Sequence, residues 1–297
     1  MTNLRIHFAS LAGTMLLSAM GTLQAQTHPG MSDQLYAIID TAWAFRSIQR
    51  PLDTEGEDAF LGPDLSQQAL DHRLQFWQKT AARLDSIDAG SLSPEDNMNL
   101  RIFRYITDDE IARYVFKAHL RPFNAEGGFH TSFGGRATNL QLRNADSAER
   151  YIDRLESFGR QVDQQLQHLR TAIETGYVLP GVILTGFDST AWQFVSSSVE
   201  ESIFYQPFRT LPDQLADAEK KRIRQRGRKA IQDVVLPAYR RLAMFLRDEY
   251  LPAAPAEVGA SAMPHGEAYY AQRIRHFTTL DMTAREVFET GKSEVHR

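Results

Sequence analysis

The sequence contains no cysteine among its 297 residues. This absence excludes disulfide bonds and thiolate metal ligands, and a chain of this length can bury a core large enough to fold without such cross-links. An excess of basic residues is also missing, since the formal net charge is −4 and the isoelectric point is about 6.1. Binding to nucleic acid phosphates needs a basic surface, so the composition predicts no nucleic acid partner.

The sequence also lacks the common catalytic motifs. A helical zinc site of the peptidase type places two histidines one helical turn apart, with a glutamate between them as general base. No such pair of histidines occurs among the nine in the sequence, which are His7, His28, His72, His119, His130, His168, His265, His276 and His296. A serine nucleophile is not indicated either, because Ser189 lacks the Gly-x-Ser-x-Gly pattern of a nucleophile elbow. We therefore assign no catalytic residue and no metal ligand, while a metal site assembled from scattered histidines stays open as an alternative.

The first segment has the pattern of a secretory signal peptide. Arg5 lies in a weakly basic start, residues 8–20 are apolar, and an approximate small-residue cleavage site ends at Ala25. The apolar run is shorter than the roughly 20 residues that span a bilayer, so we predict cleavage, with an uncleaved anchor as the alternative. Residues 1–25 are the predicted signal peptide and residues 26–297 an exported helical domain, periplasmic or extracellular, with no membrane span after cleavage.

The mature region is predicted to be mainly α-helical, as a multi-helix array with long antiparallel helices. Apolar residues recur at helical spacing, and helix start and stop signals recur along the chain. Asp146 and Glu149 resemble a capping box at one helix start, and Pro237 should kink or break another helix. The predicted helices cover 32–49, 66–85, 93–119, 146–176 and 213–250. Ser66 begins the second of these, Ser93 caps the third with Pro94 after it, and Gly176 closes the fourth.

The only glycine-rich passage, at 126–136, lacks the Gly-Lys-Ser/Thr end of a phosphate loop. We predict a tight turn or, at most, a short hairpin there on the surface, with glycine supplying positive φ angles. His130 within this passage is a candidate substrate-binding residue that could line a cleft. The alternative is a solvent-facing loop histidine.

The nearest feature to a basic patch is the run KKRIRQRGRK at 220–229. On a helix its cations point in several directions, and acidic residues flank it on both sides. We interpret the run as a solvated helix face, and the alternative is a contact with phosphate or lipid.

The last stretch, residues 265–297, is predicted to form two helices separated by a short threonine-rich break. Thr283 and Glu286 have the spacing of a capping box at the start of the second helix. The chain ends at Arg297 within that helix without a stop signal, which predicts a chain that ends mid-helix. Tyr269 and Tyr270 are candidate substrate-binding residues because a phenol can donate to a peptide carbonyl. Adjacent side chains on a helix diverge, so at most one should reach a cleft, and packing of both tyrosines is the alternative.

The order and spacing of residues in this stretch resemble the domain of unknown function 885 family of bacterial proteins. The resemblance extends weakly upstream through 179–187, 202–212 and 235–239 and is specific only in the last stretch. The residues that carry it are Gly266, Tyr269, Tyr270, Ile274, Thr278, Thr279, Thr283, Glu286, Gly291, Glu294, Val295 and Arg297.

That family looks like a group of secreted zinc metallopeptidases whose members are longer than this chain and carry a His-Glu-x-x-His motif in their second half. The resemblance implies that this chain is the N-terminal part of a two-lobed peptidase-like fold. It also implies a peptide substrate and zinc for the full-length protein, with hydrolysis not expected from this chain alone. The alternative is a complete, non-catalytic helical binding or scaffolding protein of the cell envelope. The oligomeric state stays open.

Overall fold

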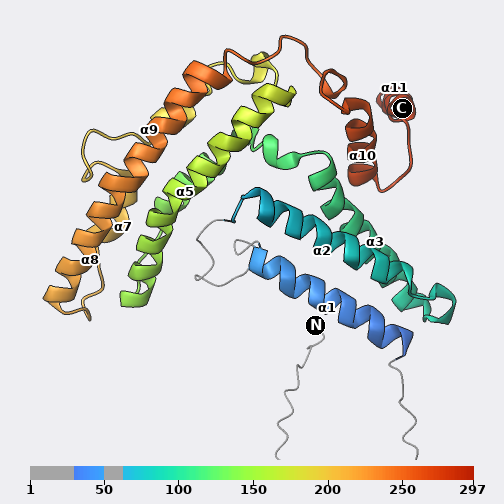
Figure 1. Ribbon diagram of the computed structural model, residues 1–297, viewed down its shortest axis with the longest axis horizontal. Helices are drawn as coiled ribbons and strands as arrows, with labels where there is room; N and C mark the ends of the chain where they lie inside the picture. Colours follow the sequence, from blue (N-terminus) through green and yellow to red (C-terminus); the bar gives the residue numbers. More distant parts are fainter. Residues whose placement is uncertain (1–29, 50–62) are drawn as a thin grey trace, which may run out of the picture.

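The computed structural model describes residues 30–49 and 63–297, so the predicted signal peptide lies outside the described residues. The fold is mainly α-helical, as predicted, and consists of two helical groups that diverge from a common end, with a short C-terminal helical pair beside the first group (Figure 1). The first group contains α1 (Met31–Gln49), α2 (Gln67–Asp85) and α3 (Pro94–Val115). Its core includes Leu35, Ile38, Trp77, Leu84 and Phe103.

Side-chain caps and one carboxylate organise this first group. The hydroxyl of Ser66 accepts the Ala69 N–H at the start of α2, at 3.3 Å. At the start of α3 the hydroxyl of Ser93 accepts the Asp96 N–H at 3.1 Å. The Asp96 carboxylate accepts the hydroxyl of Tyr36 at 2.7 Å, which ties α1 to α3. This hydrogen bond lowers the pKa of Asp96 most, and the hydrogen bonds that Ser32 and Ser93 donate to the same carboxylate lower it further.

The segment between the two groups contains the glycine-rich passage. It follows the 3₁₀ turn η3 (Ala118–Leu120), whereas another 3₁₀ turn, η2 (Ala89–Ser91), joins α2 to α3 within the first group. Strands β1 (Phe123–Asn124) and β2 (Gly127–Gly128) pair antiparallel, with Asn124 opposite Gly127. The predicted short hairpin is therefore confirmed. The expected surface turn over the rest of the passage is wrong, because residues from Phe129 onward form α4 (Phe129–Ala137). That helix packs into the larger core and buries His130 completely.

The second group is built on α5 (Ala145–Thr175), which lies beside α8 (Asp217–Ala230) and α9 (Leu236–Phe245) in Figure 1. The π-helical turn η6 (Ile231–Val235) joins α8 directly to α9, and a second π-helical turn, η7 (Leu246–Tyr250), follows the end of α9. The core of this second group is rich in aromatic rings that lie close together. Its rings include Phe133, Phe158, Phe204 and Tyr239.

Two details differ from the sequence predictions. Asn144 and Ser147 form the capping box of α5, because the Asn144 side chain accepts the Ser147 N–H at 2.8 Å; the predicted Asp146–Glu149 box is wrong. The helix predicted over 213–250 begins at Asp217 and does not break at Pro237. A π-helical turn directly before this proline carries the irregularity, with the Leu236 N–H bonding the Ile231 carbonyl.

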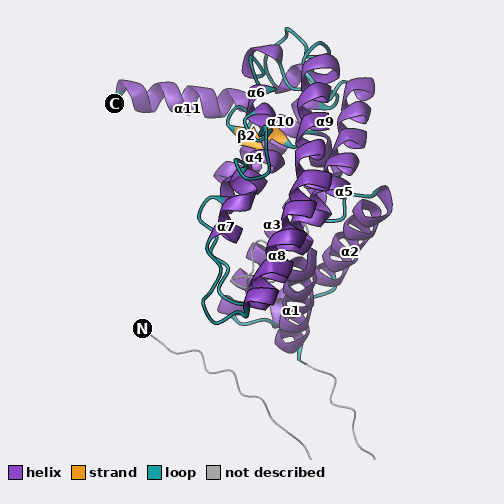
Figure 2. Cartoon of the chain, turned by 90° about the vertical axis from the view of Figure 1, so that its left-hand side faces the viewer, coloured by secondary structure: helices purple, strands orange, loops and turns teal. Residues whose placement is uncertain are grey.

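Shorter elements cover the core of the second group and lead to the C-terminal pair. They are η4 (Gly181–Ile183), α6 (Ser189–Trp192), η5 (Ile203–Tyr205), α7 (Gln206–Arg209) and η8 (Ala260–Ala262). The C-terminal pair is α10 (Gly266–Thr278) and α11 (Ala284–His296). Figure 2 shows α11 projecting from the body of the molecule, and it contains no buried residue. Within the described ranges, no helix combines the length and apolar character needed to cross a bilayer.

Candidate functional site

One carboxylate on α3 holds α10 in place. Asp109, whose side chain is only 14% exposed, accepts a hydrogen bond from His276 Nδ1 at 2.8 Å. It also accepts the Gln272 side-chain amide at 3.0 Å, and the guanidinium of Arg113 lies 3.8 Å away. Hydrogen bonds to an ionised acceptor are stronger than neutral ones, and this carboxylate is mostly shielded from solvent. Asp109 therefore fixes one face of α10 against α3.

Two aromatic side chains extend this contact to both ends of α10. The hydroxyl of Tyr105 on α3 donates to the backbone carbonyl of His276, near the point where α10 ends. At the other end, the ring of Tyr269 lies 5.8 Å from that of Phe116 and under the guanidinium of Arg121, at 4.2 Å. Because Tyr269, Gln272 and His276 are three or four residues apart, they share one side of the helix.

The two adjacent tyrosines diverge, which confirms the prediction that they do not face the same way. Tyr269 packs between α10 and α3, whereas Tyr270 is 48% exposed. Neither tyrosine lines the groove that is described in the next paragraph. Because Tyr269 packs against Phe116 at the end of α3, it positions α10, the helix whose end forms one side of that groove.

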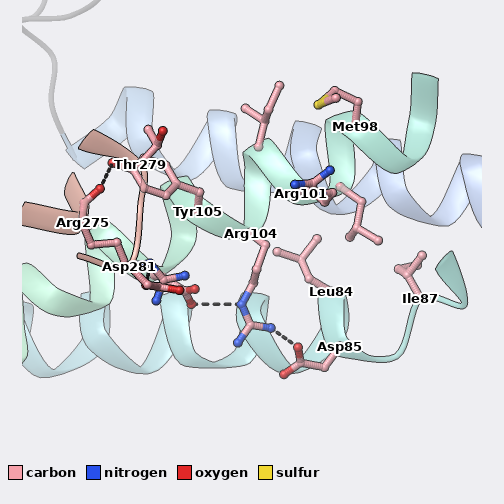
Figure 3. Close-up of a pocket in the computed structure, with 13 residues that line it drawn as sticks. Leu84, Asp85, Ile87, Met98, Arg101, Arg104, Tyr105, Arg275, Thr279 and Asp281 are labelled. Atoms are coloured by element: carbon pink, nitrogen blue, oxygen red, sulfur yellow. Dashed lines mark hydrogen bonds and ion pairs between the residues drawn. The ribbon is translucent and has the colours of Figure 1, made fainter. Parts of the chain in front are cut away.

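A groove of about 790 Å³ lies where α2 and α3 meet the end of α10 (Figure 3). Its apolar residues include Met98 and Ile102, which are 52% and 51% exposed. Large apolar side chains left this exposed side by side on a helix offer a surface for a ligand. The lining residues are Leu84, Asp85, Ile87, Met98, Leu100, Arg101, Ile102, Arg104, Tyr105, Asp108, Arg275, Thr279 and Asp281.

The charged side chains of the groove differ in how firmly they are held. Arg104 donates to Asp108 at 2.9 Å and to Asp85, so it bridges α3 and α2 (Figure 3). Arg275 lies 3.7 Å from Asp281. Arg101 is exposed and has no carboxylate within ion-pair distance in the part of the chain that the structure describes. The groove thus presents one free guanidinium next to an apolar strip.

None of the residues that line the groove is among the site residues predicted from the sequence, which are Tyr269, Tyr270 and His130. Arg101, Arg104 and Asp108 are spaced by three and four residues, so helical periodicity could have shown that they share a face. No local signal could have shown that Asp109 meets His276, because 167 residues separate them.

His130, the third predicted site residue, lies in the core of the second group. Its Nε2 is 2.8 Å from the hydroxyl oxygen of Thr190, and that hydroxyl donates to the Phe187 carbonyl at 2.6 Å. The hydroxyl oxygen must therefore accept from His130, so Nε2 carries the proton. Nδ1 is buried without a hydrogen-bond partner among the described residues. Burial lowers the pKa of His130 to about 4, because a proton on Nδ1 would place an unpaired charge in the core.

The described residues do not fit a zinc site. They contain no cluster of three or more His, Asp or Glu side chains that could hold a metal ion. Two histidines do lie together, His119 and His168, whose ring centroids are 5.0 Å apart. Nε2 of His168 is already bonded to the Leu65 carbonyl at 2.6 Å, and a catalytic zinc needs three protein ligands. Burial, and to a smaller extent repulsion from the nearby His168, lowers the pKa of His119 to about 4.

We expect Asp109→Ala to release α10 from α3. The substitution leaves His276 and Gln272 without their shared acceptor, at a cost of about 2 kcal/mol, so amide exchange along 266–278 should rise about thirtyfold. Hydrogen exchange followed by mass spectrometry measures this change. Asp281→Ala is the matched control, since that side chain is 90% exposed, and it should leave exchange in α10 unchanged. Equal exchange in the wild type and Asp109→Ala would contradict the role given to Asp109.

The fold and the groove together define a mainly helical protein with an open groove beside its C-terminal helical pair. The chain belongs to the family described as bacterial protein of unknown function (DUF885), whose model matches residues 56–297. No protein with curated annotation matches it significantly.

A solved structure gives the same fold. It is the crystal structure of a protein from Colwellia psychrerythraea described as a "putative lipoprotein", with a TM-score of 0.74 and 18% sequence identity. The match covers 90% of this chain and 49% of the Colwellia chain, so this chain spans about half the length of that protein. At this identity the likeness shows the fold alone.

Proposed function

We propose that this chain supplies one wall of a peptide-binding cleft in a larger, peptidase-like protein of the cell envelope, and that it binds peptide without cleaving it. The observation that carries the proposal is the groove between α3 and the end of α10, with its exposed apolar strip and its free guanidinium.

The chemistry of the groove suits an extended peptide. Its volume of about 790 Å³ lies within the range of about 300–1,000 Å³ that is typical of ligand sites. Met98 and Ile102 can contact apolar side chains of the peptide. Arg101 can donate to backbone carbonyls or to a terminal carboxylate, which are acceptors that a guanidinium binds well.

The comparisons support the wider setting of the proposal. The family model matches most of the chain, and the Colwellia protein, with the same fold over its matched half, is about twice as long. Its description as a lipoprotein and the predicted signal peptide at residues 1–25 both favour the cell envelope. The resemblance to zinc peptidases implies zinc for the longer protein, but the described residues here do not fit it, so we derive no hydrolytic step.

Peptide binding should depend on the groove residues. We expect Arg101→Gln and Ile102→Ser each to weaken binding of a fluorescent peptide about fivefold, the loss of about 1 kcal/mol of contact energy. Peptides from a mixed-sequence library are screened by fluorescence anisotropy, and the best binder is titrated against each variant. Arg285→Gln on α11 and Val182→Ser on η4 are matched controls, because both residues are exposed and lie outside the groove.

The same titrations test the absence of cleavage. The peptide should be recovered intact after incubation with added zinc. Cleavage that a chelator abolishes would contradict the proposal, and so would equal affinities for the groove variants and the wild type.

A further inference from the structure

The cations of α8 are sorted by helix face. On the side toward α5, Arg222 lies 2.7 Å from Glu149, and Arg226 is paired with the same carboxylate. Lys229 is paired with Asp233 one turn further along. These three positive charges are therefore neutralised by neighbouring acids.

The other face of α8 keeps most of its positive charge, because Arg228 is paired with Glu200 while Lys220, Lys221 and Arg224 have no carboxylate within ion-pair distance among the described residues. Lys220, Lys221, Arg224 and Arg228 line a hollow of about 580 Å³, together with the hydroxyl-bearing ring of Tyr205. Spacings of four residues place the side chains at 220, 224 and 228 in one row. Asp217 is the one carboxylate among the residues that line the hollow, so this side carries a surplus of positive charge on a chain whose net charge is −4.

Two of these cations have fixed positions. Arg224 donates to the backbone carbonyls of Phe208 at 3.1 Å and Arg209 at 3.4 Å, which orients its guanidinium without neutralising it. Arg228 donates to the hydroxyl oxygen of Tyr205 at 3.2 Å and is also paired with Glu200.

The close approach of α7 to α8 sets this geometry. Gly227 allows it, because a Cβ atom there would lie only 2.4 Å from the ring of Phe208. This approach brings the carbonyls of Phe208 and Arg209 within hydrogen-bond distance of Arg224.

The two lysines are free to bind a ligand. Lys220 Nζ lies 3.4 Å from the carbonyl of Asp213, and Lys221 has no carboxylate within ion-pair distance among the residues that the structure describes. Both line the hollow together with Arg224. Ammonium groups beside an oriented guanidinium form the donor set that proteins use for phosphate.

We propose that this hollow binds a phosphate-bearing anion. The oriented guanidinium of Arg224 contacts the phosphate oxygens, and the ammonium groups of Lys220 and Lys221 supply further positive charge from the lining of the hollow. The hollow is wider than a single phosphate needs, which leaves room for the group that carries it. That group is either a small soluble molecule or a phospholipid headgroup. The site is separate from the groove at α3 and does not depend on peptide binding.

Titration with pyrophosphate tests the proposal. The purified protein is titrated at low ionic strength by isothermal calorimetry, and saturable binding is expected to weaken as salt is added. Lys221→Gln should weaken binding about five- to tenfold, because it removes one charge-assisted contact from the ligand. Lys229→Gln is the matched control, since it makes the same charge change on the same helix outside the hollow, and it should leave binding unchanged.

Vesicles distinguish the two sources of phosphate. Phosphatidylcholine vesicles with and without phosphatidylglycerol are sedimented with the protein. Pyrophosphate binding without vesicle binding supports a soluble ligand, and binding to the anionic vesicles that Lys221→Gln weakens supports a headgroup. Equal weakening by Lys221→Gln and Lys229→Gln overturns the proposal, because it would show diffuse attraction to the whole helix. Absence of saturable binding to both probes overturns it as well.

Discussion

Phe158→Ala should destabilise the protein by about 4 kcal/mol. Phe158 is fully buried on α5, its ring stacks on Phe133 at 3.9 Å, and it lies 4.7 Å from the ring of Tyr239. Truncation removes these contacts and leaves a cavity between α4, α5 and α9, three helices that cannot easily close around it. Chemical denaturation of the wild type and the variant, followed by circular dichroism, measures the loss.

Phe277→Ala is the control for this prediction. It makes the same chemical change on α10, where the ring is 77% exposed, and it should alter the free energy of unfolding by less than about 0.5 kcal/mol. A loss of under about 1 kcal/mol for Phe158→Ala would mean that the aromatic core of the second helical group is not the main source of its stability.

Acidification from pH 7 to pH 4 should remove roughly 3 kcal/mol of stability through His130 alone. The folded pKa is about 4, below the ordinary value of 6.5. Between these two values the unfolded state binds the proton and the folded state does not, so the free energy of unfolding falls as the pH falls. The stability is fully present above about pH 6.5 and is lost progressively toward pH 4.

His130→Gln isolates this effect, because glutamine can still donate to Thr190 but does not titrate. Unfolding free energies of both proteins are measured at several pH values between 7 and 4. The difference in the free energy of unfolding between the wild type and the variant should shrink toward low pH, because only the wild type loses stability through His130. The loss of stability through His119 at low pH is common to both proteins and cancels in this difference. Parallel curves would show that His130 is not held neutral by burial.

The features that sequence reasoning predicted correctly depend on neighbouring residues. Ser66 and Ser93 begin α2 and α3, and Thr283 begins α11 with Glu286 at the third position of its capping box. Gly176 ends α5 with a φ of 79°, a conformation that glycine adopts without strain. In each case a few consecutive residues contain the whole signal.

The features that it missed depend on contacts between distant segments. The passage at 126–136 appears polar and glycine-rich in isolation, yet Phe129 and Phe133 pull it into the core and bury His130. The sequence predicts a kink or break at Pro237. In the structure a π-helical turn directly before the proline takes up the irregularity, and packing against α5 keeps the helix continuous. Local sequence propensity predicts structure poorly where tertiary packing opposes it.

The candidate site also depends on contacts between segments that are distant in the sequence. Its groove forms only because α10 returns to α3 through Asp109 and Tyr105, contacts that join positions more than 160 residues apart. Tyr269 is among the residues that carry the family resemblance, and the chemistry of its phenol makes it a candidate for substrate binding, with packing as the alternative. In the structure Tyr269 packs against Phe116 and Arg121. A substrate role for Tyr269, Tyr270 or His130 stays a prediction.

Hydrogen exchange with and without a bound peptide tests most directly whether the groove between α3 and α10 is a peptide site. Our account predicts that a peptide selected by binding slows exchange along 98–108 and 275–281, the segments that line the groove on α3 and at the end of α10, and leaves α8 unchanged. Protection confined to α8, or a bound peptide that protects neither groove segment, would contradict it.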